Sequence, residues 1–104
     1  MNTYFCKLYG PRKTFPQDMT ESEAQAMQRH AAYWRARMEK GAVVVFGPVA
    51  DPAGTYGMLI LEVEDEPEAR ALLEADPVIQ AKIGFRFEMH PMPRGALHLP
   101  FARS

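Results

Sequence analysis

Apolar and polar residues alternate with two different periodicities along this chain, and these periodicities predict four strands and two helices. The four expected strands lie at residues 3–9, 42–47, 56–63 and 85–90. In these segments β-branched and aromatic residues are concentrated or alternate with polar ones, as in a pleated strand. From Met27 to Met38 apolar residues instead recur every three or four positions, which predicts a helix with one buried face. A second helix is expected to begin at Pro67, because proline fits the first helical turn.

The first predicted helix carries signals at both ends. Thr20 and Glu23 have the spacing of a capping box, in which each side chain accepts a hydrogen bond from the other residue's backbone N–H. Gly41 stands where a residue in the left-handed conformation commonly ends a helix. His30 lies at the edge of the predicted apolar stripe, one turn before Trp34. This helix is therefore expected to hold a titratable imidazole against the core.

Turn-forming residues set the remaining boundaries. Gly47-Pro48 is expected to break the hydrogen-bond ladder of the second strand, and residues 51–54, Asp-Pro-Ala-Gly, supply a turn before the third. Asp76-Pro77 should stop the second helix, because the residue before proline is disfavoured in the α conformation. Residues 78–82 then have room for one short helical turn.

The resulting order is strand, helix, strand, strand, helix, strand, which is the order of the ferredoxin-like α+β fold. In that fold an antiparallel four-stranded sheet carries both helices on one face. At 104 residues the chain is long enough for one such core and too short for two. We therefore expect a single domain over residues 1–93 and a tail without clear periodicity over residues 94–104.

The second and third predicted strands are apolar on both faces, although the helices can cover only one. In the second strand we place Ala42, Val44 and Phe46 on one side, and Val43 and Val45 on the other. A strand with one face in water should instead alternate with polar residues. Because so short a chain has no third layer, a homodimer packed sheet against sheet is predicted.

The charge balance argues against polyanionic partners. The formal net charge is −1 and the largest basic cluster is Arg12-Lys13, so we expect no binding to nucleic acid or to a membrane. The sequence shows neither a signal-peptide pattern nor an apolar run of about 18 residues. The single cysteine, Cys6, lies in a predicted strand, where burial is favoured over a nucleophilic role and a reducing compartment is suitable. The expected location is the cytoplasm.

His30 and Asp76 are the pair of side chains best suited to chemistry. Both predicted helices cover the same face of the sheet, so contact between the two side chains is geometrically possible. A carboxylate that accepts from one imidazole nitrogen prepares the other nitrogen as a general base. The residues alone leave a second interpretation open, in which His30 is a core residue and Asp76 only caps the turn before Pro77.

Aromatic side chains near His30 are candidates for a ligand pocket, and the glycine of Gly47-Pro48 permits a close backbone approach. The candidate binding residues are Tyr9, Tyr33, Trp34, Phe46, Gly47 and Pro48. The same aromatic residues also suit a small core, and the glycine suits a neighbouring strand, so both uses stay open. No spacing among the histidines and acids indicates a metal, and no nucleotide-binding motif is present, so we expect neither a metal nor a cofactor.

Several short motifs together resemble the YCII-related family of small α/β proteins. The motifs are Gly10-Pro11, Met27-x-x-His30-x-x-Tyr33-Trp34, Gly41, Gly47-Pro48-Val49, Asp51-Pro52, Asp76-Pro77 and Glu88-x-His90-Pro91. They run over nearly the full length of the chain. One departure is Lys82-Ile83-Gly84, where the family commonly has glycine directly after the alanine, so the fourth strand could begin at a shifted position.

The resemblance implies a ferredoxin-like subunit that dimerises into an α/β barrel, and a His-Asp dyad at His30 and Asp76. One branch of the family resembles a dehydrochlorinase of chlorinated hydroxyquinols, which implies a proton-transfer lyase or isomerase. The first hypothesis is therefore a cofactor-free acid/base enzyme acting on a small aromatic or hydroxylated molecule. The alternative is a non-catalytic homodimeric module that binds a small ligand in the same pocket. The sequence names no substrate.

Overall fold

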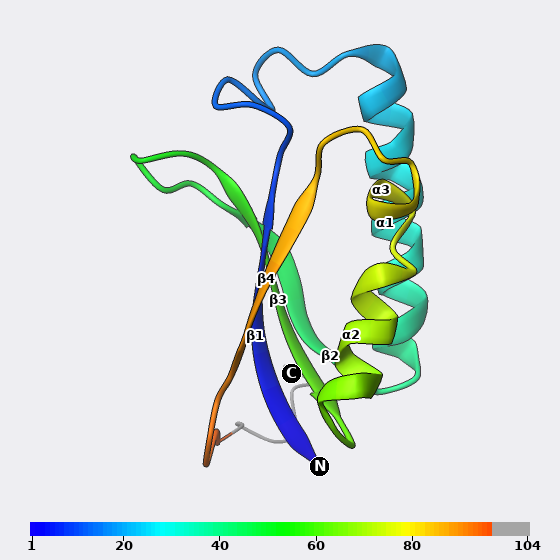
Figure 1. Cartoon of the computed structure of the whole chain (residues 1–104), viewed down its shortest axis with the longest axis vertical. Helices are drawn as coiled ribbons and strands as arrows, with labels where there is room; N and C mark the ends of the chain where they lie inside the picture. Colours follow the sequence, from blue (N-terminus) through cyan, green and yellow to red (C-terminus); the bar gives the residue numbers. More distant parts are fainter. Residues whose placement is uncertain (97–104) are drawn as a thin grey trace, which may run out of the picture.

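Four antiparallel strands form one sheet, and all helices lie against one of its faces (Figure 1). This computed structural model describes residues 1–96. In chain order the elements are β1 (Asn2–Tyr9), α1 (Glu21–Glu39), β2 (Val43–Val49), β3 (Tyr56–Val63), α2 (Glu66–Glu74), α3 (Pro77–Gln80) and β4 (Arg86–Pro91). The strands lie in the order β2-β3-β1-β4. The predicted ferredoxin-like α+β fold is confirmed, and the short helical turn after Asp76 is the helix α3.

Both predicted ends of α1 are formed as expected. The Thr20 hydroxyl accepts from the N–H of Glu23 at 3.2 Å, and the Glu23 carboxylate accepts from the N–H of Thr20 at 3.0 Å. After the last turn Gly41 has a φ of +89°, a conformation that other residues adopt with strain. Its N–H donates to the carbonyl of Met38 at 3.0 Å, which satisfies one free carbonyl of the helix end.

The buried face of α1 differs slightly from the predicted stripe. The residues that bury their side chains are Glu23, Ala26, His30 and Trp34, spaced by three or four positions. Met27 and Ala31, which were expected in the stripe, are only half-buried. His30 therefore lies within the buried face, with an exposed fraction of 8%, and not at its edge.

The prediction that Gly47-Pro48 breaks the second strand is wrong. β2 continues through both residues, with Gly47 opposite Met58 and Pro48 opposite Gly57. Proline cannot donate to a neighbouring strand, but β2 is an edge strand and needs partners on one side only. Gly47 and Pro48 are therefore part of the extended strand β2.

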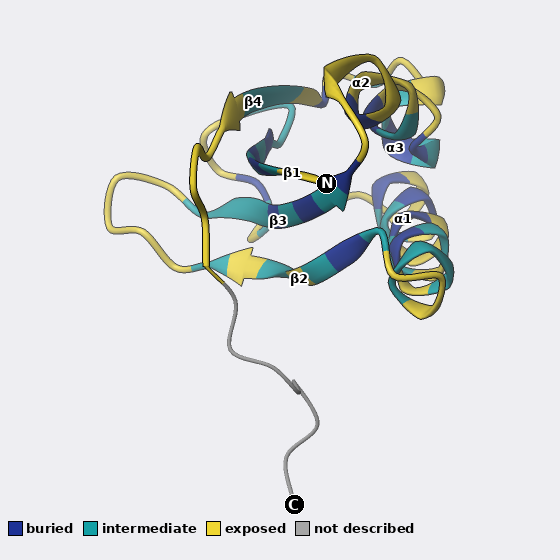
Figure 2. Cartoon of the chain, turned by 90° about the horizontal axis from the view of Figure 1, so that it is seen from below, coloured by how far each residue is buried: buried dark blue, intermediate teal, exposed yellow. Residues whose placement is uncertain are grey.

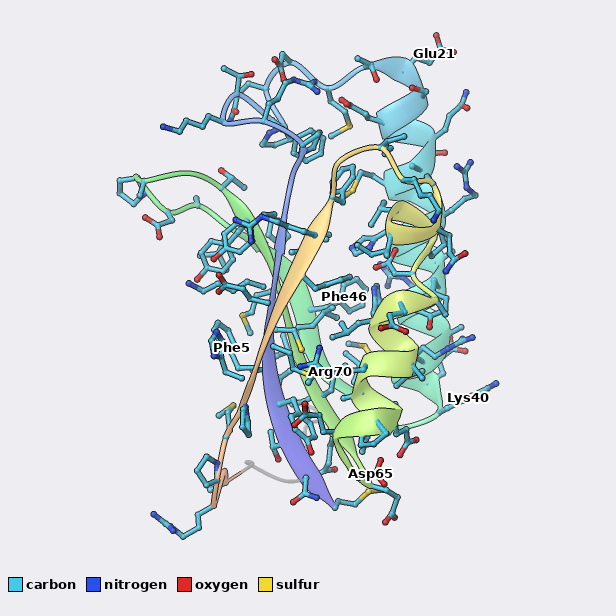
Figure 3. The ribbon with its side chains drawn as sticks, in the orientation of Figure 1. Phe5, Glu21, Lys40, Phe46, Asp65 and Arg70 are labelled. Atoms are coloured by element: carbon cyan, nitrogen blue, oxygen red, sulfur yellow. The ribbon has the colours of Figure 1, made fainter. Side chains whose placement is uncertain are left out.

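A bulge in β2 also corrects the predicted faces of that strand. Val43 pairs with Leu61 and Val45 pairs with Ile60, so Val44 is the extra residue of the bulge. Beyond the bulge Phe46 pairs with the buried Leu59. Val43 and Phe46 therefore face the helices together, although we had expected them on opposite sides. Figure 3 shows Phe46 between the sheet and the helices.

The core lies between the sheet and the helices, where Figure 2 shows the buried segments turned toward each other. Its centre is formed by Trp34 from α1, Cys6 from β1 and Leu61 from β3, none of which is exposed. Burial raises the pKa of the Cys6 thiol to about 12, so this cysteine is an inert core residue as predicted.

Within residues 1–96, no element covers the opposite face of the sheet. Phe5 of β1 points away from the helices, as Figure 3 shows. It pairs with Ile60 of β3, which in turn pairs with Val45 of β2, so the three form an apolar row across three strands. Val45 is 43% exposed.

Two further expectations concern the ends of the described chain. The fourth strand begins at Arg86, one residue later than predicted. Of the expected tail over residues 94–104, residues 97–104 lie outside the described residues. Among residues 1–96, no helix combines the length and the apolar composition that crossing a membrane requires.

Candidate functional site

Asp76 occupies the junction between α2 and α3. The helix α2 ends at Glu74, and Asp76 caps α3, whose first residue is Pro77. One carboxylate oxygen, Oδ1, accepts from the N–H of Val78 at 2.9 Å, the usual bond of an aspartate at a helix N-terminus. The side chain has no exposed surface, so its second oxygen must also find its partners inside the protein.

Two side chains of α1 supply those partners. His30 Nδ1 lies 2.6 Å from Asp76 Oδ2, and the indole Nε1–H of Trp34 donates to the same oxygen at 2.6 Å. With the bond from Val78, three donors converge on this carboxylate. A carboxylate oxygen only accepts hydrogen bonds, so Nδ1 must be the donor. The hydrogen of the neutral imidazole is therefore placed on Nδ1. Nε2 of His30 is then left with a free lone pair.

The free nitrogen of His30 is accessible, and His30 borders a cavity. Among residues 1–96, no buried side-chain nitrogen or oxygen lacks a hydrogen-bond partner. Nε2 makes no hydrogen bond within that part of the chain, so this atom is accessible and not buried. His30 is one of the residues that line a cavity of about 320 Å³. A molecule in this cavity could therefore exchange a proton with Nε2.

The cavity is walled by residues from several segments of the chain. Its lining includes His30 and Met27 from α1, Phe46 from β2, residues 55–59 from the start of β3, and Phe15 from the loop between β1 and α1. The Phe15 ring packs edge-on against the ring of Phe85, with centroids 5.1 Å apart. Helix, hairpin and loop thus enclose a largely apolar space on the helix side of the sheet.

The structure brings together most of the predicted site. His30, Phe46, Gly47 and Pro48 all line the same cavity. Asp76 does not line it, and contacts it only through the imidazole of His30. An alanine Cβ at Gly47 would meet no atom within 4 Å, so no neighbouring strand requires a glycine there.

Tyr9, Tyr33 and Trp34 are not among the lining residues. The Tyr9 hydroxyl donates to Glu88 Oε1 at 3.3 Å on the uncovered face of the sheet. The Tyr33 hydroxyl donates to a carbonyl of α2 at 2.7 Å. Trp34 is fully buried, and its indole N–H donates to the Asp76 carboxylate, so its position supports the carboxylate and not the cavity wall.

Sequence reasoning missed the loop of residues 10–20, which supplies Phe15, Pro16 and Met19 to the lining. Arg12 holds this loop to the first turn of α1. Its two terminal nitrogens donate to both oxygens of Glu23 at 2.8 Å, and its Nε donates to Asp18 at 2.9 Å. The capping-box spacing indicated Glu23, but no local signal connects it with Arg12.

The hydrogen bonds from Arg12 also affect the pKa values of the two acids that they reach. The hydrogen bonds from Arg12, followed by the backbone N–H of Thr20, lower the pKa of Glu23 to about 2. Arg12 and then Thr14 likewise hold the pKa of Asp18 below its usual value. The loop that walls the cavity is therefore held by charged groups that stay ionised at neutral pH.

The comparisons with known proteins agree with this fold. Residues 5–93 match the family model of the YCII-related domain, so the chain belongs to the YCII-related family. A solved structure, that of the uncharacterized protein TM1266 from Thermotoga maritima, is similar with a TM-score of 0.50 and 13% identity. The match covers 88% of this chain and 95% of that one, and at this identity it supports the fold alone. A search of curated proteins found no match.

Proposed function

We propose that this protein is a cofactor-free enzyme that uses His30 and Asp76 for proton transfer on a small molecule in the cavity. The observation that carries the proposal is the Trp34–Asp76–His30 arrangement, in which Nε2 of the cavity-lining His30 has no hydrogen-bond partner within residues 1–96. A pocket used only for binding does not require a buried carboxylate behind its imidazole. Such a carboxylate is the usual means of orienting a general base.

The proposed step is an acid/base reaction of the lyase or isomerase type. Nε2 of His30 accepts a proton from the bound molecule, and the electron pair left behind forms a new double bond. In a lyase the pair displaces a leaving group, whereas in an isomerase the proton returns to another atom of the same molecule. Asp76 keeps the imidazole in the required tautomer and stabilises the positive charge that develops on the ring.

A second candidate is a binding module without catalysis. It is favoured by the lining of the cavity, which is mostly apolar, as in many pockets for small molecules. In that case His30 would only accept a hydrogen bond from the ligand. The two candidates differ in one observable, which is whether a proton of the bound molecule is exchanged.

Hydrogen exchange in heavy water can separate them. Hydroxylated aromatic compounds are screened for binding, and each bound compound is then followed by NMR for deuterium uptake at carbon or loss of a leaving group. We expect His30→Gln to abolish the reaction, while His90→Gln, which changes an exposed histidine of β4, leaves it intact. Equal rates in wild type and His30→Gln would show that another group carries the proton. Binding without any exchange would favour the binding module.

We also infer that the protein forms a homodimer through the uncovered face of the sheet. The row of Val45, Ile60 and Phe5 supports this, because apolar surface of this kind is normally covered by a partner. Light scattering should give a mass near twice 11.8 kDa for the wild type. Ile60→Asp should give monomers, whereas Glu62→Gln, on the same strand, should not. A monomeric wild type at micromolar concentration would contradict the dimer.

The cytoplasm is the compartment that we propose for this protein. The support is its single cysteine, Cys6, which is a free buried thiol and has no partner for a disulfide within the chain.

A further inference from the structure

We infer that the cavity beside His30 selects uncharged molecules that present one hydrogen-bond donor to Nε2, and rejects carboxylates and phosphate esters of the same shape. This inference rests on the proposed function, because it concerns the substrate class of the same site. It goes further by assigning the charge and polarity of the ligand. Three features of the cavity carry it.

The first feature is the charge of the lining. None of the residues that line the cavity is an aspartate, glutamate, lysine or arginine, and His30 is the only one with an imidazole. A charged group that enters an apolar cavity loses its hydration and must find a partner there. This cavity supplies no fixed countercharge, so an anionic ligand would be desolvated without compensation.

The second feature is the arrangement of the nearby cations, which are engaged elsewhere. Arg12 shares the loop with Phe15, but its guanidinium is bound to Glu23 and Asp18. The Lys7 ammonium lies over the ring of Tyr56 at 4.8 Å, and Lys7 does not line the cavity. Arg12 and Lys7 therefore do not turn the cavity into an anion site.

The third feature is the shape and polarity of what remains. Met19 from the loop and Met27 from α1 line the cavity, and flexible thioether side chains adapt to apolar ligands of various outlines. Nε2 of His30 is an acceptor in the tautomer that Asp76 imposes. A hydroxyl group on an otherwise apolar molecule satisfies both conditions.

Three probes of one frame test the charge and the donor separately. They are p-cresol, which is neutral and carries a hydroxyl, p-toluate, which is an anion at pH 7, and toluene, which has no donor. Binding is read from the methyl signals of methionines labelled with carbon-13. Met19 and Met27 report on the cavity, and Met38 and Met89, which do not line it, serve as internal controls.

We expect p-cresol to shift the methyl signals of Met19 and Met27, and p-toluate to bind roughly tenfold or more weakly because its charge is desolvated. Toluene should bind more weakly than p-cresol, because it leaves Nε2 without a donor. Equal or tighter binding of p-toluate would overturn the charge selection. Equal binding of toluene and p-cresol would overturn the role of the donor. Shifts confined to Met38 or Met89 would overturn the choice of cavity.

A designed cation makes the test sharper. Met27→Lys places an ammonium group in the cavity wall and should reverse the preference in favour of p-toluate. Gln28→Lys adds the same charge at the next position of α1, which is exposed, and should change nothing. An unchanged preference in a folded Met27→Lys protein would count against the inference, and the wild-type comparison stands if that variant does not fold.

The two proposals fail in different ways. Loss of proton exchange is judged with His30→Gln, whereas charge selection is judged by binding alone. A protein that exchanges protons and binds p-toluate as well as p-cresol keeps the proposed function and loses the inferred ligand class. A protein that prefers p-cresol but exchanges no proton keeps the ligand class as a property of the binding module.

Discussion

Asp65 and Asp76 have the same local role and very different surroundings. Each caps a helix with its Oδ1, which accepts from a backbone N–H at 3.0 Å in Asp65 and 2.9 Å in Asp76. Asp65 is exposed, and among the described residues its second oxygen accepts no hydrogen bond. The second oxygen of Asp76, whose side chain is fully buried, accepts from His30 and Trp34. A helix cap thus becomes a candidate functional group only where the fold brings other side chains to its free oxygen.

The largest expected effect is on activity and comes from replacing each aspartate by asparagine. An amide can still cap the helix, but one of its two polar atoms is a donor, which cannot face the Nδ1–H of His30. We expect Asp76→Asn to lower proton exchange by roughly 10²–10⁴-fold, the usual contribution of a positioned acid or base. Asp65→Asn should leave the rate unchanged. An equal rate of proton exchange in both variants would show that Asp76 does not contribute to the reaction.

Replacement by alanine compares the two sites through stability. Asp76→Ala leaves the buried donors of His30 and Trp34 without an acceptor, and we expect a loss of roughly 3–5 kcal/mol in the free energy of unfolding. Asp65→Ala removes only an exposed cap and should lower it by about 1 kcal/mol. Urea unfolding measures both values. Similar losses would mean that the buried contacts of Asp76 add little to its role as a cap.

Trp34 and Tyr33 offer a finer comparison, because each donates one hydrogen bond from the same helix. Trp34→Phe removes one of the two bonds to Asp76 Oδ2 and should lower the free energy of unfolding by roughly 1–3 kcal/mol. Tyr33→Phe removes a bond to a carbonyl of α2 and should lower it by about 1 kcal/mol. Only Trp34→Phe should also alter the nitrogen NMR signals of the His30 ring. Unaltered ring signals would leave Trp34 a purely structural residue.

Glu23, which belongs to the capping box of α1, extends the comparison to a carboxylate whose pKa is lowered. Because the pKa of Glu23 is lowered from 4.5 to about 2, its contribution to stability is fully present above 4.5 and is lost as the pH falls toward 2. Glu23→Gln should therefore flatten the acid side of the stability curve. Glu21→Gln, an exposed change in the same turn, should leave that side steep. Thermal unfolding between pH 2 and 6 distinguishes the two variants. Parallel curves of stability against pH for Glu23→Gln and wild type would contradict a lowered pKa of Glu23.

Local signals were sufficient for most of the fold. The capping box at Thr20, the glycine at position 41 and the proline after Asp76 each act on neighbouring backbone, so their effects could be predicted from residues a few positions apart. The prediction failed at Gly47-Pro48, where the outcome depends on a partner strand. Proline is tolerated because β2 lies at the edge of the sheet, and its place in the sheet is a property of the whole fold.

The sequence by itself determined the element order, the residues capable of chemistry and, through the motifs it shares with the YCII-related family, the pairing of His30 with Asp76. Only the tertiary structure decided how that pair is built. Trp34 was expected in the pocket and lies behind Asp76, while Phe15 and Met19 were not expected and form a wall. The physical reason is sequence distance. Packing α1 against α3 and clamping the loop through Arg12 join residues that no local rule relates, and the direction of each side chain follows from that packing.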